Sequence, residues 1–310
     1  MKIFRLLKRK CNTVINKPGS IIIRFLVKFS FLFNDDFYLK ALYRFEMGKK
    51  LNLTNPITYN EKLQWLKINY RIPEMTKMVD KYEVKKYVAE LIGEKYIIPT
   101  LGVWNSFEEI DFDILPDKFV LKTTHDSGGV VLCKDKNTFD FKKAENKLNK
   151  HLKLNSYYLS REWPYKNVKP RIIAEKYMIE GDNEDLDDFK FFCFDGKPRA
   201  LYVATERLSG NVKFDYFDMD FNHLDLVQSH EQSNVKISKP RNFDRMVELS
   251  KVLSSGLPHV RVDFYNLEGE IYFGELTFYH FGGRTPFYPE EWDYKFGSWI
   301  DLTKMTNIKY

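Results

Sequence analysis

Apolar residues recur at helical spacing in the first third of the chain. Before residue 95 they repeat every three or four positions over three segments, which predicts helices at Phe37–Met47, Thr58–Tyr70 and Glu74–Ile92. Gly93 follows the last segment and is a typical helix stop. The first part of the chain is therefore expected to be helical, with a boundary near residue 95.

From Ile97 onward, short β-rich runs dominate the chain. Strands are predicted at Ile97–Val103, Lys118–Thr124, Gly129–Cys133, Arg171–Tyr177, Phe189–Phe194, Arg199–Ala204, Lys213–Phe217, His259–Tyr265 and Glu270–Phe278. Helices are expected between them at Phe139–Leu152 and Phe243–Ser255. Asp195-Gly196 and Glu268-Gly269 separate apolar runs and predict hairpin turns. The pattern indicates an α+β chain with mostly antiparallel sheets.

The composition supports a folded protein from a reducing compartment. The chain has 310 residues, of which 44% are hydrophobic, enough to form one large domain or two intimate ones. Its three cysteines, Cys11, Cys133 and Cys193, are widely spaced and form neither a disulfide framework nor a zinc motif. We therefore expect a cytoplasmic location.

The net charge of +6 is concentrated at one end of the chain. Residues 1–50 contain twelve basic and three acidic residues, so they carry +9 and the remainder carries −3. A nucleic-acid groove would spread Lys and Arg over the folded surface. We therefore expect no nucleic-acid partner.

The basic end also contains an apolar stretch, Ile21–Phe33, interrupted by Arg24 and Lys28. This stretch is shorter than the ~20 residues needed to span a bilayer, and no small-residue cleavage site follows it. Residues 1–34 are interpreted either as a basic amphipathic helix resting on anionic lipid or as a packed helix with a solvated basic face.

A lysine-bearing strand, Phe119–Lys122, is followed by the loop Thr123–Gly129 and another apolar strand. Such a loop, ending in Gly128-Gly129, can lay backbone N–H groups over phosphates while Lys122 balances their charge. The alternative is an ordinary hairpin with glycine at its turn. The spacing is neither a Walker A motif nor a GxGxxG motif.

Two acidic residues are predicted to meet on neighbouring strands. Strand alternation places Arg261 and Asp263 on one face, and Glu275 and Thr277 on one face of the hairpin partner. Paired carboxylates of this kind suit Mg²⁺ shared with phosphate oxygens. The alternative is a pair of acids that face solvent.

Two further segments carry charge at strand ends. Glu175 and Lys176 lie in the run Ile172–Met178, and Asp188 and Lys190 share one face of the following strand. Taken separately, Glu175 and Lys176 are more often a strand-end ion pair, and Lys190 is more often a solvated lysine at a sheet edge.

The order of these motifs along the chain resembles that of the nucleotide site of ATP-grasp enzymes. The motifs are, in sequence, the lysine strand, the glycine loop, Glu-Lys-Tyr-Met, Asp-Phe-Lys, Arg-Val-Asp and Glu-Leu-Thr. The chain more narrowly resembles the TupA-like ATP-grasp family over residues 35–302, through Asn55–Trp65, Asp80–Tyr82, Phe119–Gly129 and Gly274–Pro286. The resemblance implies an ATP-grasp fold of two α+β subdomains with mostly antiparallel sheets, preceded by a helical region. The implied divisions are a basic segment at 1–34, a helical region at 35–95 and a nucleotide-binding and catalytic domain at 96–310.

The resemblance also implies roles for individual residues, with ATP and Mg²⁺ as cofactors. It assigns Lys122 to the α-phosphate and adenine edge, Gly128 and Gly129 to the β- and γ-phosphates, Glu175, Lys176 and Met178 to the adenine hinge, Asp188 to ribose, Lys190 to phosphate or metal, and Asp263 and Glu275 to Mg²⁺. Thr277 stands where many superfamily members have a metal-binding Asn, and Arg261 would stabilise the transferred phosphoryl group.

The implied activity is a carboxylate–amine ligase of bacterial surface-polysaccharide assembly. A carboxylate-bearing glycan or amino acid would be activated as an acyl phosphate, and an amine would then displace phosphate. Arg284 is the candidate for gripping a substrate carboxylate or lipid-linked diphosphate, and His280 the candidate for relaying a proton. For both residues, purely structural roles are the alternative.

Two other functions are weighed against a ligase. A glycosyltransferase that uses a nucleotide sugar would match the label often given to this family, and Asp111-Phe112-Asp113 and Asp218-Met219-Asp220 are formal Asp-x-Asp matches. A polysaccharide-binding protein would use its 19 Tyr and five Trp residues for stacking on sugars. It would not need Lys122, Lys190 and the acid pair together. The resemblance favours an enzyme on the cytoplasmic side, with peripheral contact to anionic membrane.

Overall fold

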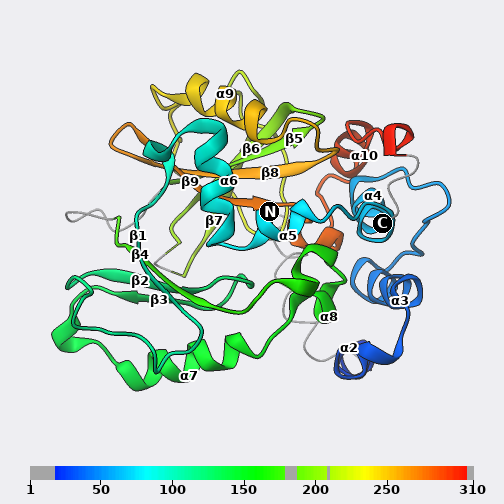
Figure 1. The fold of residues 1–310 in the computed structure, drawn as a ribbon. Helices are drawn as coiled ribbons and strands as arrows, with labels where there is room; N and C mark the ends of the chain where they lie inside the picture. Colours follow the sequence, from blue (N-terminus) through cyan, green and yellow to red (C-terminus); the bar gives the residue numbers. More distant parts are fainter. Residues whose placement is uncertain (1–17, 179–186, 208–209, 306–310) are drawn as a thin grey trace.

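The computed structural model describes residues 18–178, 187–207 and 210–305 (Figure 1). The N-terminal part is helical, as predicted. Its elements are α2 (Pro18–Lys28), η1 (Ser30–Leu32), α3 (Asp35–Met47), α4 (Tyr59–Asn69), α5 (Glu74–Val79), α6 (Glu83–Ile92) and η2 (Glu94–Tyr96). The Asn34 side chain caps α3, and a capping box of Thr58 and Glu61 begins α4.

The long helix predicted at Glu74–Ile92 is instead two helices. The Asp80 carboxylate accepts hydrogen bonds from the backbone N–H groups of Tyr82 and Glu83, and so caps a second helix. The Lys81 N–H donates to the carbonyl of Thr124 rather than to the preceding turn. The break therefore ties Lys81 to the loop that follows strand β2 (Phe119–Thr123).

The first sheet has four antiparallel strands in the order β1-β4-β2-β3. These strands are β1 (Thr100–Trp104), β2 (Phe119–Thr123), β3 (Val130–Cys133) and β4 (Ile172–Lys176). Helix α7 (Phe141–Leu152) covers this sheet on the side away from the second sheet, and buries Ala144 and Leu148 against it (Figure 1). The short elements η3 (Lys136–Thr138), α8 (Ser156–Ser160) and η4 (Trp163–Asn167) complete this region.

The second sheet has five antiparallel strands in the order β7-β6-β5-β8-β9. These strands are β5 (Asp187–Phe194), β6 (Lys197–Thr205), β7 (Lys213–Phe217), β8 (Val260–Leu267) and β9 (Glu270–Thr277). Asp195-Gly196 and Glu268-Gly269 form the predicted hairpin turns, with all four residues in the left-handed region. The chain also contains α9 (Phe243–Leu253), η5 (His280–Gly283), α10 (Glu291–Ser298) and η6 (Leu302–Met305). The prediction of an α+β fold with mostly antiparallel sheets is confirmed.

The N-terminal helices share a core with the second sheet. Tyr59 of α4 is fully buried, with its ring in edge contact with Phe192 of β5 and Phe296 of α10. A Cβ at Gly297 would lie 2.3 Å from the Ile57 carbonyl oxygen, so only glycine allows α10 this close to the start of α4. The division proposed at residue 95 stays a prediction.

Part of the predicted basic segment, residues 1–17, lies outside the described residues. Within the remainder, Leu26 of α2 packs against Tyr38 and Leu42 of α3. Over the described parts of the chain, no helix has the length and apolar character required to cross a membrane.

Buried His259 makes the stability of this core depend on pH. Its Nδ1 donates to the Cys193 carbonyl, so its Nε2 accepts from the Tyr59 hydroxyl at 2.9 Å. Burial lowers the pKa of His259 to about 3, whereas the pKa of an unfolded histidine is about 6.5. Below about pH 6.5, His259 therefore takes up a proton on unfolding. This uptake lowers the free energy of unfolding by ~1.4 kcal/mol for each unit by which the pH falls.

His259→Gln should remove this dependence, because glutamine can keep one donor and one acceptor without titrating. We expect urea denaturation between pH 6.5 and 5 to show a loss smaller by ~2 kcal/mol in the variant than in the wild type. Equal losses in the two proteins would contradict this account.

Candidate functional site

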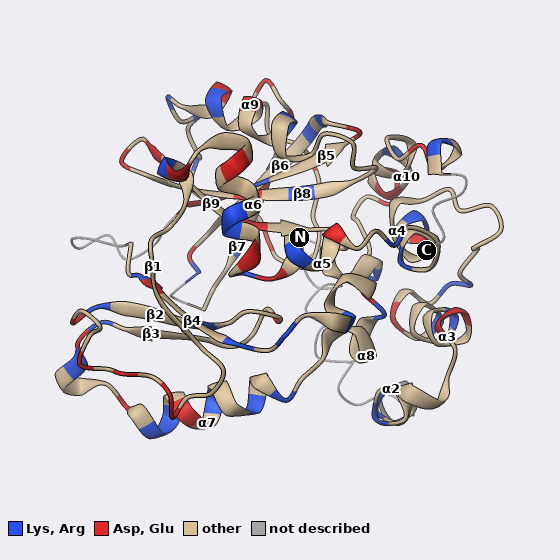
Figure 2. Cartoon of the chain, in the orientation of Figure 1, with Lys and Arg blue, Asp and Glu red and all other residues tan. Residues whose placement is uncertain are grey.

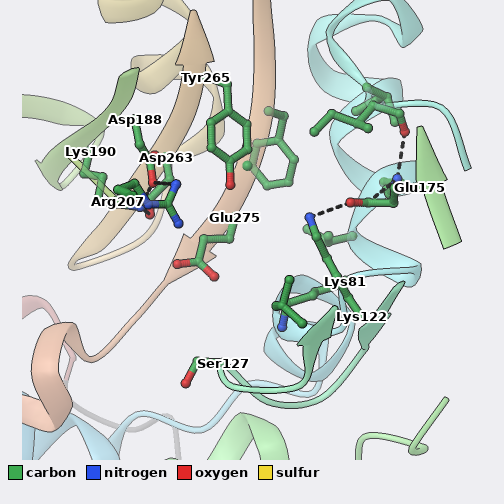
Figure 3. A pocket seen from close by; sticks show the side chains of 17 residues that line it. Lys81, Lys122, Ser127, Glu175, Asp188, Lys190, Arg207, Asp263, Tyr265 and Glu275 are labelled. Atoms are coloured by element: carbon green, nitrogen blue, oxygen red, sulfur yellow. Dashed lines mark hydrogen bonds and ion pairs between the residues drawn. The ribbon is translucent and has the colours of Figure 1, made fainter. Parts of the chain in front are cut away.

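A pocket of about 180 Å³ lies between the two sheets, and ionisable side chains line much of it (Figure 3). The first sheet, α6 and the segments beside α6 supply one side; β5, β8 and β9 supply the other. Its charged lining residues are Lys81, Lys85, Lys122, Glu175, Asp188, Lys190, Arg207, Asp263 and Glu275.

On the first sheet, Glu175 lies between two lysines. Lys122 pairs with Ile173 across the β2–β4 ladder, so it is the diagonal neighbour of Glu175 on the same face. The Nζ atoms of Lys122 and of Lys85 each lie 2.5 Å from a Glu175 oxygen. Although burial opposes it, the two lysines lower the pKa of Glu175 to about 2. The predicted hinge carboxylate is therefore ionised and held by two cations.

The loop after β2 is fixed from within. The Asp126 carboxylate accepts from the Thr123 hydroxyl and from the Gly129 N–H, and it also pairs with His151 of α7. Lys81 donates to the Asp126 carbonyl, and burial lowers the pKa of Lys81. The Asp126 carbonyl thus holds Lys81 at the pocket, and it is the one hydrogen-bond partner of the Lys81 Nζ among the described residues.

Ser127, rather than the two glycines, is the residue of this loop that lines the pocket (Figure 3). Gly129 packs where a Cβ would lie 1.9 Å from the Thr123 hydroxyl oxygen. Its carbonyl accepts from the Thr123 N–H. Gly129 is therefore needed for close packing within the hairpin, and the phosphate contacts of Gly128 and Gly129 stay a prediction.

On the second sheet, Lys190 bridges two buried acids. Its Nζ lies 2.7 Å from Asp188 and also pairs with Asp263, its neighbour across the β5–β8 ladder. Arg207 binds the same Asp188 oxygen at 2.9 Å. The carboxylate predicted to bind ribose is therefore held by two cations.

The three predicted metal ligands converge on one nitrogen. Nη2 of Arg261 lies 2.6 Å from Asp263 Oδ2, 3.0 Å from Glu275 Oε1 and 3.0 Å from Thr277 Oγ1. Burial raises the pKa of Asp263 to about 6, although Arg261 and Lys190 act to lower it. Burial also acts to raise the pKa of Glu275, but Lys190 and Arg261 lower it overall.

These oxygens fit Mg²⁺ in donor type and in convergence, and Arg261 occupies the point where they meet. Among residues 18–178, 187–207 and 210–305, no group of three or more His, Cys, Asp or Glu residues could hold a metal ion. A bound Mg²⁺ would therefore need oxygen ligands beyond those of Asp263, Glu275 and Thr277.

His280 is buried behind Arg261 and does not line the pocket. Arg261 has only donors, so His280 Nδ1 accepts from Arg261 Nη1 at 2.6 Å, and Nε2 donates to Gln228 at 3.0 Å. Burial lowers the pKa of His280 well below its usual range. Both ring nitrogens are therefore engaged, one of them with Arg261, and the predicted proton relay stays a prediction.

Arg284 lies apart from the pocket because the backbone turns sharply after β9. Phe281, Gly282 and Gly283 are consecutive residues in the left-handed region. Gln64 donates to both glycine carbonyls, at 2.9 and 2.7 Å, and Lys67 donates to that of Gly282 at 2.7 Å. Arg284 then pairs with Glu46 of α3 at 2.8 Å.

Neither Lys176 nor Met178 lines the pocket. The Lys176 side chain is exposed, and its backbone N–H donates to the Pro99 carbonyl. That N–H is already engaged, and the adenine-hinge roles of these residues stay predictions.

Four ionisable lining residues were not assigned as site residues from the sequence: Lys81, Lys85, Arg207 and Tyr265. In the sequence, the available signal for Lys81 and Lys85 was Asp80, a residue type that caps helices, followed by these two lysines four residues apart. Arg207 follows β6 in a segment with no motif of its own.

A family model described as TupA-like ATPgrasp matches residues 61–301 of the chain. No curated protein gives a significant match. The chain is similar to solved structures at low identity and low TM-score. D-alanine–D-alanine ligase from Bacillus anthracis is 21% identical over 64% of this chain and 56% of that one, with a TM-score of 0.36.

Two further structures show similar values. The D-alanine–D-alanine ligase of Helicobacter pylori is 18% identical over 71% of this chain and 61% of that one, with a TM-score of 0.36. The ATP-grasp ligase PsnB, in complex with minimal precursor, Mg and ADP, is 11% identical over 70% and 57%, also with a TM-score of 0.36. The chain thus spans less than two thirds of the length of these three relatives.

Lys190 is expected to be important for stability, because its loss would leave two buried carboxylates each short of one cation. Lys190→Met should lower the free energy of unfolding by ~2–3 kcal/mol, since Asp188 keeps Arg207 and Asp263 keeps Arg261. Lys197→Met, at an exposed position on β6, should stay within ~0.5 kcal/mol of the wild type. Urea denaturation of the three proteins tests this, and equal stabilities would refute the bridging role.

Proposed function

Because the chain belongs to the TupA-like ATP-grasp family, we propose that it is an ATP-dependent ligase that joins a carboxylate to an amine. The two sheets that enclose the pocket correspond to the two α+β subdomains of the ATP-grasp fold. The observation that carries the proposal is the lining of this pocket, where five cationic side chains face four carboxylates. A triphosphate with its metal ion requires this combination of charges.

The cations on the two sides would divide the work of binding the nucleotide. Lys81 and Lys122 would contact phosphates from the first side, and Lys190 and Arg261 would act from the second. Asp188 would hold the ribose. When bound to Asp263, Glu275 and Thr277, Mg²⁺ supplies charge screening at the phosphates.

The proposed reaction has two steps. A substrate carboxylate oxygen attacks the γ-phosphorus, and ADP leaves, which gives an acyl phosphate. An amine then attacks the acyl carbon, and phosphate leaves, which gives an amide. Arg261 would stabilise the negative charge on the transferred phosphoryl group, and closure of the Thr123–Gly129 loop would exclude water.

The family resemblance supports a role in bacterial surface-polysaccharide assembly. We propose that the carboxylate belongs to a glycan or an amino acid, and that the enzyme works on the cytoplasmic side, where ATP is available. Arg284 would act on the substrate only if it exchanged Glu46 for a substrate carboxylate or diphosphate.

A glycosyltransferase remains the competing activity for this family. Its formal metal motifs have other uses in this structure: Asp111 accepts from the Asp113 N–H, and Asp218 accepts from the Asp220 N–H, both within turns. Neither pair lines the pocket. This arrangement favours the ligase.

Nucleotide binding separates the two activities. The purified protein should bind Mg²⁺-ATP in isothermal titration calorimetry, whereas a uridine diphosphate-sugar should give no comparable signal. Lys122→Met and Glu275→Gln should each weaken Mg²⁺-ATP binding by about 10–100-fold, the effect of losing one charge-assisted contact. Lys118→Met, at an exposed position beside β2, is the matched control and should bind normally.

Binding of the sugar nucleotide without binding of ATP would sink the ligase proposal. Unchanged Mg²⁺-ATP affinity in both pocket variants would show that ATP binds elsewhere.

A further inference from the structure

An apolar surface is exposed along α2, η1 and the start of α3. Between 44% and 67% of each of its large side chains is exposed. These side chains are Ile22, Phe25, Phe31, Leu32 and Phe37. The Phe29 ring links two of them, with its centroid 4.7 Å from that of Phe25 and 6.5 Å from that of Phe31. We call these five residues the apolar edge.

The segment that carries the apolar edge is anchored from its other side. Arg161 is almost fully buried and donates through Nη2 to the carbonyls of Ser30 and Phe33. Its Nε lies 2.9 Å from Asp35, at the start of α3. Because the backbone of η1 is fixed by a buried charge, the apolar edge is presented outward by the fold itself.

Two basic side chains lie beside the apolar edge. Arg24 and Lys28 lie on α2 with exposed side chains. The exposed acid nearby, Asp36, is neutralised by Lys40 at 2.8 Å. The apolar edge therefore lies within a region of positive charge.

Helix α7 adds a second basic element. Its lysines and the one that follows it are exposed, with Glu145 as the single acidic residue of the helix. These lysines are Lys142, Lys143, Lys147, Lys150 and Lys153. Figure 2 shows α2 and α7 at the same lower edge of the molecule, both carrying basic residues.

We propose that this edge of the molecule docks on an anionic lipid bilayer. The apolar side chains would enter the boundary between headgroups and acyl chains, while Arg24, Lys28 and the α7 lysines contact lipid phosphates. Large exposed apolar surfaces with a charged surround are typical of interaction sites. The inference deepens the proposed function, because it names the surface on which the enzyme works. It rests on that function only in placing the enzyme on the cytoplasmic side of the membrane.

Vesicle co-sedimentation of the full chain tests the proposal. The wild type should sediment with phosphatidylcholine vesicles that contain phosphatidylglycerol, much less with pure phosphatidylcholine, and less as salt is raised. Phe31→Ser combined with Leu32→Ser should weaken binding at least ~10-fold. Arg24→Gln with Lys28→Gln, and separately Lys143→Gln with Lys150→Gln, should weaken binding to the anionic vesicles only.

Val252→Ser is the matched control, because Val252 is an exposed apolar residue on α9 at the opposite edge of the molecule (Figure 1). It should bind vesicles like the wild type, and all variants should keep their affinity for Mg²⁺-ATP. If the wild type binds vesicles but not Mg²⁺-ATP, the proposed ligase fails while the docking surface stands.

Failure of the wild type to sediment with anionic vesicles, or equal binding by the wild type and the Phe31/Leu32 variant, would overturn the proposal. Light scattering identifies a different occupant. A wild-type dimer that becomes monomeric in the Phe31/Leu32 variant, without vesicle binding, would show that a second copy of the chain covers the apolar edge.

Discussion

The guanidinium of Arg261 is the group on which the centre of the molecule depends. It bonds to Asp263 on its own strand, to Glu275 and Thr277 on β9, and to His280 in the turn beyond. Without it, carboxylates on adjacent strands would face one another in a poorly solvated place at a cost of several kcal/mol. The acidic face of the sheet can exist because a cation with several fixed donors lies between its members. A ligand that brings phosphate and a metal ion to these oxygens would replace some of the hydrogen bonds of Arg261. We therefore expect binding of such a ligand to be accompanied by a rearrangement of the Arg261 side chain.

Most of the regular structure could be predicted from the sequence, because strand alternation and hairpin turns are local properties. A period of two is enough to place Asp263 and Lys190 on a common face once β5 and β8 pair. The partners of the cations could not be predicted in the same way. Lys85 reaches Glu175 from a helix far away in the sequence, and that meeting depends on how α6 packs beside the first sheet.

The positions of several predicted site residues also have physical causes. His280 and Arg284 follow β9 directly, so an extended continuation would place them near the acids. The left-handed residues after His280 redirect the chain, so that Arg284 turns toward α3, whereas His280 is buried against Arg261. Similarly, the glycines of the β2–β3 loop suggest phosphate binding, yet Gly129 is required by contact with Thr123. In both places a backbone constraint, which depends on three-dimensional packing, decides which side chain reaches the pocket.

The turn at Phe281–Gly283 has a consequence for the order in which the chain folds. Its two glycine carbonyls accept hydrogen bonds from Gln64 and Lys67, side chains more than two hundred residues earlier in the sequence. During synthesis, α4 leaves the ribosome long before the turn exists. Contacts this distant in sequence slow folding, because the intervening chain must be closed into a loop before they form. The last strand of the site is therefore expected to reach its final geometry only after the C-terminal part of the chain has been made, so that nascent chains carry Lys81, Lys85 and Lys122 long before Asp263 and Glu275 are in place.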